Sequence, residues 1–128
     1  MSNVSPMTQS AADAVQALVR DHVDAFNAHD HARLLAGLAT DVVSTTGADT
    51  FRGHQALTEV FDDGLWAMQP SLTIVDLLVG EGRAAAQRLE VLAVEGRQRR
   101  FMIACFFEIR VGRIQSVKVY REGSANIA

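Results

Sequence analysis

Two opposite charges, Arg88 and Glu90, stand two residues apart in the strand-like segment of residues 87–92. Because side chains alternate between the two faces of a strand, both charges are expected on the same face. In the next segment, residues 99–109, every residue between Phe101 and Phe107 is apolar, so both faces of the expected strand are apolar. This predicts a strand that is covered on both faces. On an apolar sheet face, the guanidinium could stabilise an oxyanion and the carboxylate could move a proton.

The pairing of these strands decides what surrounds the two charges. A hairpin turn at residues 95–98 and a three-residue loop at residues 110–112 are expected. On a solvated face the pair would be worth about 0 to 1 kcal/mol. Among apolar neighbours it costs several kcal/mol unless the charges pair or bind something, so we interpret both as pocket residues. The neighbours predicted across the sheet are Cys105 and Val117 for Arg88, and Ile103 and Val119 for Glu90.

His22 lies inside the apolar stripe of the first expected helix, between Leu18 and Phe26. Two interpretations stay open: a core histidine with satisfied hydrogen bonds, or a proton-transfer group that reaches the pocket and titrates near neutrality. Cys105 is expected to be a small core residue or pocket wall, because Arg88 is the only evident cation that could lower its pKa. Trp66 is interpreted either as a lid over the pocket or as an ordinary core anchor.

Hydrophobic spacing and turn residues predict the elements that would position these groups. Ser10 with Asp13 is predicted as the capping box of the first helix, and Asp30 as the N-cap of the second. Helices on one face of a twisted sheet predict an α+β fold: three N-terminal helices on a strongly curved, mainly antiparallel sheet, forming a cone-shaped half-barrel with an internal cavity. The expected elements are helices at residues 10–27, 30–38 and 54–63, one strand at 42–46 and four strands after Pro70.

In their order and spacing, several segments resemble the nuclear transport factor 2-like superfamily, and within it the SnoaL-like polyketide cyclases, ketosteroid isomerases and limonene-epoxide hydrolases. The resemblance covers residues 11–122. It implies the half-barrel fold and a small enzyme without a cofactor, although this superfamily hosts many functions. The segments that carry it are residues 26–30, 38–41, 51–53, 87–92, 112–114 and 119–122.

Carried over position by position, the resemblance also shows departures from the known sites. The epoxide hydrolases have an Arg-x-Asp pair that matches Arg88 and Glu90, and a second Asp where this chain has Val119. The ketosteroid isomerases imply a pocket role for His22, but their general base and their protonated Asp are replaced here by Thr46 and Cys105. These departures argue against epoxide hydrolysis and steroid isomerisation in those forms.

The leading hypothesis is an enzyme that binds a hydrophobic polycyclic or terpenoid-like molecule and performs acid-base isomerisation, cyclisation or hydrolysis. Arg88 would orient or stabilise an oxyanion, and Glu90 or His22 would move a proton. The alternative is a non-catalytic small-molecule-binding or dimerisation domain of the same fold. No cofactor and no metal are expected. The expected ligand-binding residues are Phe26, Ser44, Thr46, Trp66, Ile103, Cys105, Phe107, Val117 and Val119.

Composition sets broader expectations. The 128 residues are 48% hydrophobic and 21% charged with a net charge of -3, which indicates one globular domain and argues against nucleic acid as the partner. Residues 1–9 are predicted to be a disordered leader and residues 10–128 the domain. The single cysteine and the absence of a signal-peptide pattern or an apolar run long enough to span a bilayer favour a cytoplasmic protein with no membrane partner. Met102, Ala104 and Phe106 on the outer sheet face predict a homodimer.

Overall fold

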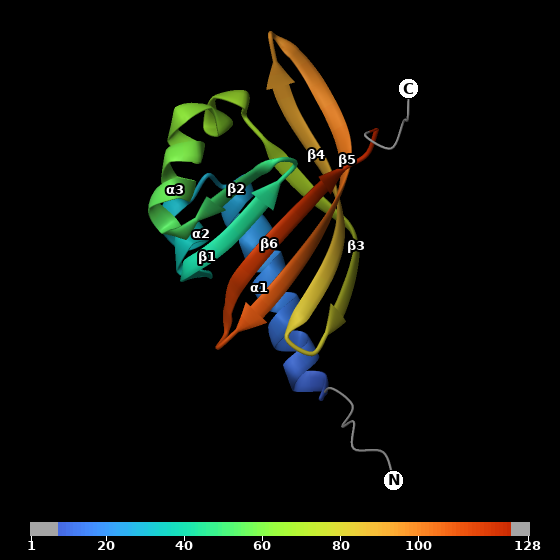
Figure 1. Cartoon of the computed structure of the whole chain (residues 1–128). Coiled ribbons are helices and arrows are strands. Elements are labelled where there is room, and N and C mark those ends of the chain that lie inside the picture. Colours follow the sequence, from blue (N-terminus) through green and yellow to red (C-terminus); the bar gives the residue numbers. More distant parts are fainter. Residues whose placement is uncertain (1–7, 124–128) are drawn as a thin grey trace.

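The computed structural model describes residues 8–123 of the chain. Three helices, α1 (Gln9–Asn27), α2 (His31–Ala36) and α3 (Gly53–Val60), lie on one side of a sheet whose outer face is toward the viewer in Figure 1. Two short turns of helix, Phe61–Leu65 and Trp66–Met68, follow α3. The strands are β1 (Leu38–Thr46), β2 (Asp49–Arg52), β3 (Ser71–Gly80), β4 (Arg83–Val94), β5 (Arg97–Arg110) and β6 (Arg113–Arg121).

The strands form one curved sheet in the order β2-β1-β6-β5-β4-β3. Neighbouring strands are antiparallel except for β1 and β6, which pair in parallel. The two edges, β2 and β3, do not meet, so the sheet is an open half-barrel with α1 packed against its inner face. This architecture confirms the predicted α+β fold. Strand β2 was not expected from the sequence, because residues 47–53 read as a turn leading into the third helix.

The start of α1 differs from the prediction. Thr8 is the N-cap, and its Oγ1 accepts a hydrogen bond from the backbone N–H of Ala11 at 3.1 Å. The capping box predicted at Ser10 is therefore wrong, and Gln9 already belongs to the helix. Residues 1–7 of the predicted leader lie outside the described residues. The apolar stripe of α1 is buried at Val15, Val19, Val23 and Phe26 as its spacing predicts, and Ala25 is buried as well.

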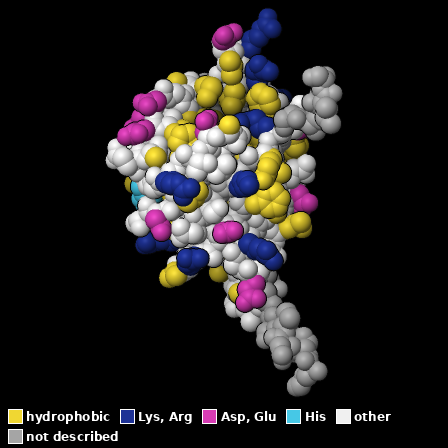
Figure 2. Space-filling model, viewed as in Figure 1, with side chains coloured by type: hydrophobic (Ala, Val, Ile, Leu, Met, Phe, Trp, Pro, Cys, Tyr) yellow, Lys and Arg dark blue, Asp and Glu magenta, His cyan; other side chains and the backbone are white. Residues whose placement is uncertain are grey.

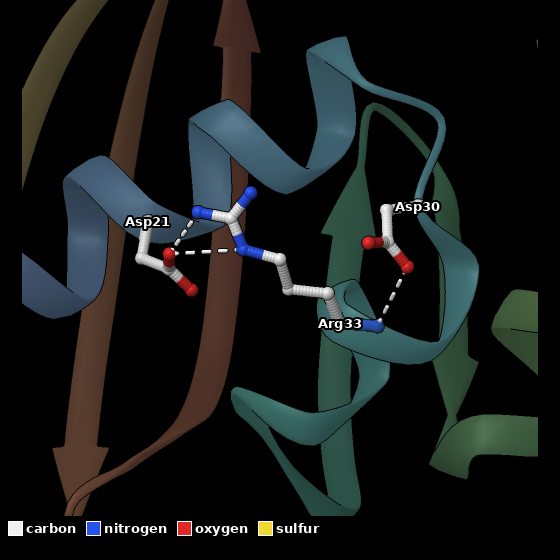
Figure 3. Close-up of polar contacts among 3 residues, drawn as sticks. All are labelled: Asp21, Asp30 and Arg33. Carbon is white, nitrogen blue, oxygen red and sulfur yellow. Dashed lines mark hydrogen bonds and ion pairs between the residues drawn. The ribbon is translucent and has the colours of Figure 1, made fainter.

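The junction between α1 and α2 is held by polar contacts (Figure 3). Asp30 caps α2 as predicted, because its Oδ1 accepts a hydrogen bond from the backbone N–H of Arg33 at 3.1 Å. The guanidinium of Arg33 also pairs with Asp21 of α1. Both side chains of this pair are exposed to solvent, which screens their attraction, so the main effect of the pair is to connect the two helices.

Both turns between the long strands are shorter than predicted. Glu95 and Gly96 have φ of 52° and 77°, and Val111 and Gly112 have φ of 52° and 71°. Positive φ at both central residues is typical of the type I′ turn, which joins antiparallel strands with only two residues. Glu and Val rarely adopt this conformation, so the residue types at these positions did not predict the turn.

The shorter turns change the pairing of the strands. Arg88 lies opposite Ile103, and Glu90 lies opposite Phe101, so the predicted pairs with Cys105 and Ile103 are wrong by two residues. A shift of two keeps every side chain on its predicted face, since a strand alternates with a period of two. The inner face of β4 therefore still carries both charges.

The pairing of β5 with β6 differs as well. A bulge between Glu108 and Ile109 shifts the register, and Cys105 lies opposite Val119 while Ile103 lies opposite Arg121. The predicted pairs of Cys105 with Val117 and of Ile103 with Val119 are wrong. Arg121 thereby enters the row that holds Arg88.

The outer face of the sheet is not covered within the described part of the chain. Phe106 is 52% exposed, Leu78 is 65% exposed and Tyr120 is 49% exposed. The prediction that β5 is covered on both faces is therefore wrong for this single chain. Figure 2 shows hydrophobic side chains gathered beside basic and acidic ones on this face. Within residues 8–123, no helix has the length and apolar character that crossing a membrane requires.

Candidate active site

A cavity of about 300 Å³ lies between the inner face of the sheet and the helices. Its walls are mainly apolar, and the two buried charged residues, Arg88 and Glu90, both reach it. A cavity of this size and character is typical of sites for small organic molecules. Nine of the twelve site residues predicted from the sequence line it: His22, Phe26, Ser44, Thr46, Arg88, Glu90, Ile103, Val117 and Val119.

Three predicted site residues lie outside this lining. Trp66 joins an aromatic cluster instead, stacked on Phe61 at 4.8 Å between ring centroids and on His29 at 4.4 Å. Cys105 and Phe107 are fully buried in the core beneath the cavity. Phe107 supports two residues that do line it, because its ring lies near both His22 and Arg88.

Arg88 is held on the cavity wall by strand β4 and is only 3% exposed. Its guanidinium carbon lies 5.7 Å from the ring centroid of Phe107, a cation–π contact. Its Nε is buried and has no hydrogen-bond partner among residues 8–123, and neither ion pair found there includes it. A buried cation without an ion pair is costly, and such groups mark candidate functional sites.

Glu90 is paired with Arg121 rather than with its neighbour Arg88. Arg121 Nε donates to Oε1 of Glu90 at 2.9 Å, and Nη2 donates to Oε2 at 3.1 Å. This two-bond geometry is the strong, oriented form of the arginine–carboxylate interaction. The side chain of Glu90 is 7% exposed and that of Arg121 is 39% exposed, so the acid is the buried member. Each carboxylate oxygen keeps lone-pair capacity for a further hydrogen bond or a proton.

His22 reaches the cavity from α1, and its ring lies edge-on to Phe107 with 5.8 Å between centroids. The residue is partly exposed, but its Nδ1 is buried and has no hydrogen-bond partner among the described residues. Burial, and next the positive charge of Arg88, lower the pKa of His22 to about 3, against a smaller opposite effect of Asp21. The imidazole is therefore neutral at pH 7, which removes the titration near neutrality that the proton-transfer interpretation required.

The lowered pKa of His22 predicts an acid sensitivity of the fold. An unfolded histidine has a pKa of about 6.5, so between the two pKa values the unfolded chain binds the extra proton and stability falls as pH decreases. From pH 7 to pH 5 the His22 share of this loss should approach ~2 kcal/mol. Urea unfolding of the wild type and His22→Gln at both pH values measures it, since the other histidines cancel in the difference. Equal pH dependence in the two proteins would contradict the prediction.

Cys105 is a poor nucleophile in this environment. Burial raises the pKa of its thiol to about 11, against smaller opposite effects of the Arg88 charge and of a hydrogen bond from the Lys118 backbone. The thiol therefore stays protonated at neutral pH and acts as a small apolar core group.

Nine further residues line the cavity and were not predicted from the sequence, and Arg121 is the most important of them. Alternation along β6 places Val117, Val119 and Arg121 on one face, so the sequence could have predicted that Arg121 faces the cavity. The helical spacing of Leu57 and Val60 in α3, and of Phe61 in the helical turn that follows, likewise indicates one inward face. The remaining five are Leu38, Asp49, Phe51, Leu65 and Leu72.

Comparison with known proteins supports the architecture. A model of the SnoaL-like domain family matches residues 19–117. No curated protein sequence matches the chain significantly.

Solved structures with the same fold differ widely in sequence. A proposed polyketide cyclase from Xanthomonas campestris pv. campestris is 20% identical, with 86% of this chain and 91% of that chain covered and a TM-score of 0.79. A proposed ketosteroid isomerase from Kribbella flavida is 20% identical, with 91% and 84% covered and a TM-score of 0.77. An LEH-like epoxide hydrolase from M. tuberculosis is 18% identical, with 88% and 85% covered and a TM-score of 0.77. At these identities the likeness establishes the fold alone.

Proposed function

The chain belongs to the SnoaL-like domain family, whose model matches residues 19–117, and we propose that it is a small enzyme that acts on a hydrophobic molecule without a cofactor. Structures of similar fold include proteins described as a polyketide cyclase, a ketosteroid isomerase and an epoxide hydrolase. The proposed reaction is an acid-base isomerisation, cyclisation or hydrolysis of a polycyclic or terpenoid-like substrate.

The observation that carries the proposal is a buried arginine, Arg88, which forms no ion pair with any residue between 8 and 123, beside a buried carboxylate, Glu90, in one apolar cavity. Glu90 would take a proton from a substrate carbon or from an attacking water, through a lone pair that Arg121 does not use. Negative charge would then develop on a substrate oxygen, and Arg88 would stabilise it in surroundings of low dielectric.

The other lining residues would position the substrate. Phe26, Ile103, Val117 and Val119 offer apolar surface that would exclude water from the reacting atoms. Ser44 and Thr46 bring hydroxyl groups to the same cavity from β1. The neutral ring of His22 would act as a hydrogen-bonding group and not as a cation.

A second candidate function is binding without turnover. The resemblance to ketosteroid isomerases and epoxide hydrolases implies acids at the positions of Thr46 and Val119, which this chain lacks there, and both oxygens of Glu90 already bond to Arg121. Such a domain would hold the same hydrophobic ligand or serve in dimerisation. For either function we propose a cytoplasmic protein and a homodimer through the outer sheet face that Phe106 and Tyr120 occupy. Light scattering that gives the mass of one chain would remove the dimer.

Glu90→Gln separates the two functions. The amide keeps the size of the side chain and one acceptor for Arg121, but it removes the base. If the domain is catalytic, turnover across a panel of epoxide, enone and polyketide-like substrates should fall by about 10²- to 10⁴-fold. Glu108→Gln makes the same change at an exposed position of β5 and should leave turnover unchanged. Binding heat without turnover that depends on Glu90 would instead favour the binding domain.

A further inference from the structure

Four charged residues line the cavity: Arg88, Glu90, Arg121 and Asp49. Asp49 is exposed at the start of β2. The carboxylate of Glu90 is engaged by Arg121 through two hydrogen bonds. Apart from Asp49, two guanidinium groups thus face one carboxylate, and the buried Arg88 is left without an ion pair among residues 8–123.

Arg88 cannot relieve this burial by losing its proton, because an arginine remains charged at any ordinary pH. Its Nε–H group is buried and unpartnered, and the side chain lies on the cavity wall. A planar fork of N–H donors is complementary to a carboxylate, whereas an apolar or neutral group would leave its positive charge uncompensated. The group that best complements Arg88 on this wall is therefore an anionic oxygen group of a ligand.

The surroundings indicate how much charge that group carries. His22, whose pKa burial and Arg88 lower to about 3, supplies no second cation at neutral pH. Arg121 is already engaged by Glu90. Asp49 is exposed and its charge is solvated, so Arg88 is the one buried charge of the lining that lacks an ion pair among residues 8–123, and it matches one negative charge. The apolar remainder of the cavity matches a hydrophobic body.

We propose that the ligand of this cavity is a hydrophobic monocarboxylate whose carboxylate binds Arg88. The inference names the substrate class of the proposed function and rests on that function for the use of the same cavity. The carboxylate would fix the orientation of the hydrophobic body and place it along Glu90 and the apolar wall. If Glu90 takes a proton from the carbon next to the carboxylate, the developing negative charge is delocalised onto the oxygens that Arg88 holds, so both roles of Arg88 are met by one contact.

The test compares 2-naphthoate with 2-naphthamide, which share their rings and the shape of the head group but differ in charge. Isothermal titration calorimetry of the full chain should show about 10- to 100-fold tighter binding of naphthoate, the range expected for hydrogen bonds to a charged group. In Arg88→Met this preference should disappear, while naphthamide binding should change by less than about 3-fold. Arg113→Met removes the same charge at an exposed position of β6 and should keep the preference.

The comparison of the two probes on the wild type requires no variant, so the test holds even if Arg88→Met folds poorly. Arg88→Lys keeps the charge but loses the planar fork of donors, and its preference for naphthoate over naphthamide should be intermediate. Equal affinities, failure of both probes to bind, or a preference that survives Arg88→Met would each overturn the proposal. Equal affinities together with Glu90-dependent turnover of a neutral substrate would leave the proposed function standing. A naphthoate preference without any such turnover would support the carboxylate ligand and count against catalysis.

Discussion

Arg121→Ala is expected to lower the free energy of unfolding by about 3 to 5 kcal/mol, the range for breaking a buried ion pair by removing one partner. Within residues 8–123, the carboxylate of Glu90 accepts two side-chain hydrogen bonds, and both come from Arg121. Glu90 is the buried member of the pair, so the loss of its partner leaves a carboxylate that is largely removed from bulk water. The cost therefore comes from a desolvated carboxylate more than from the lost contact itself.

Urea denaturation followed by the fluorescence of Trp66 measures the loss. Arg99→Ala is the matched control, because Arg99 and Arg121 both place a guanidinium over the ring of Phe101, at 5.5 and 5.8 Å, and Arg99 is exposed. We expect the control to cost less than about 1 kcal/mol. A double-mutant cycle with Glu90→Ala should give a coupling of about 2 kcal/mol. Additive losses in that cycle would show that the pair is not coupled and would contradict the prediction.

Arg88→Met is expected to act in the opposite direction and to raise the free energy of unfolding by about 1 to 3 kcal/mol. The variant replaces a buried cation that has no ion pair within the described part of the chain with an apolar side chain of similar length, next to Ile103 and Phe107. The cation–π contact with Phe107 is lost, and that loss is smaller than the desolvation that is removed. Stabilisation combined with loss of function is typical of residues kept for a site and not for the fold.

The same denaturation assay measures this gain, and Arg88→Lys, which keeps the charge, should not show it. Because the charge of Arg88 helps to lower the pKa of His22, Arg88→Met should also raise that pKa, which an NMR titration of the imidazole detects. A variant less stable than the wild type, with an unchanged His22 titration, would mean that Arg88 belongs to the structural core.

The face of each strand was predictable from the sequence, whereas the register was not. Alternation places Arg88 and Glu90 on one face, and the apolar residues predicted across the sheet make it the inner face. A pairing error of two residues cannot change that. The register depends on two tight turns in which Glu95 and Val111 adopt the left-handed conformation. Neither residue type is typical of such a turn, so the sequence does not predict it. The predicted cross-strand neighbours were wrong for this reason.

The partner of Glu90 was missed for a related reason. Arg121 comes from a distant strand, beyond a bulge between Glu108 and Ile109 that shifts the pairing. A bulge adds a residue to one strand and leaves little trace in an apolar pattern. The position of His22 on an inward stripe was visible in the sequence, but its lowered pKa depends on burial and on the nearby Arg88, which only the folded chain brings together.

The parallel pairing of β1 with β6 has a consequence for how the protein is made. Ser44 and Thr46, synthesised early, face Val117 and Val119, which belong to the last strand. Contacts between distant parts of a chain form late and slow folding, because the intervening loop must first be closed. The cavity wall can therefore be completed only after β6 has left the ribosome. Until then the nascent chain exposes the apolar inner face of its sheet, the period in which a chaperone would be of most use.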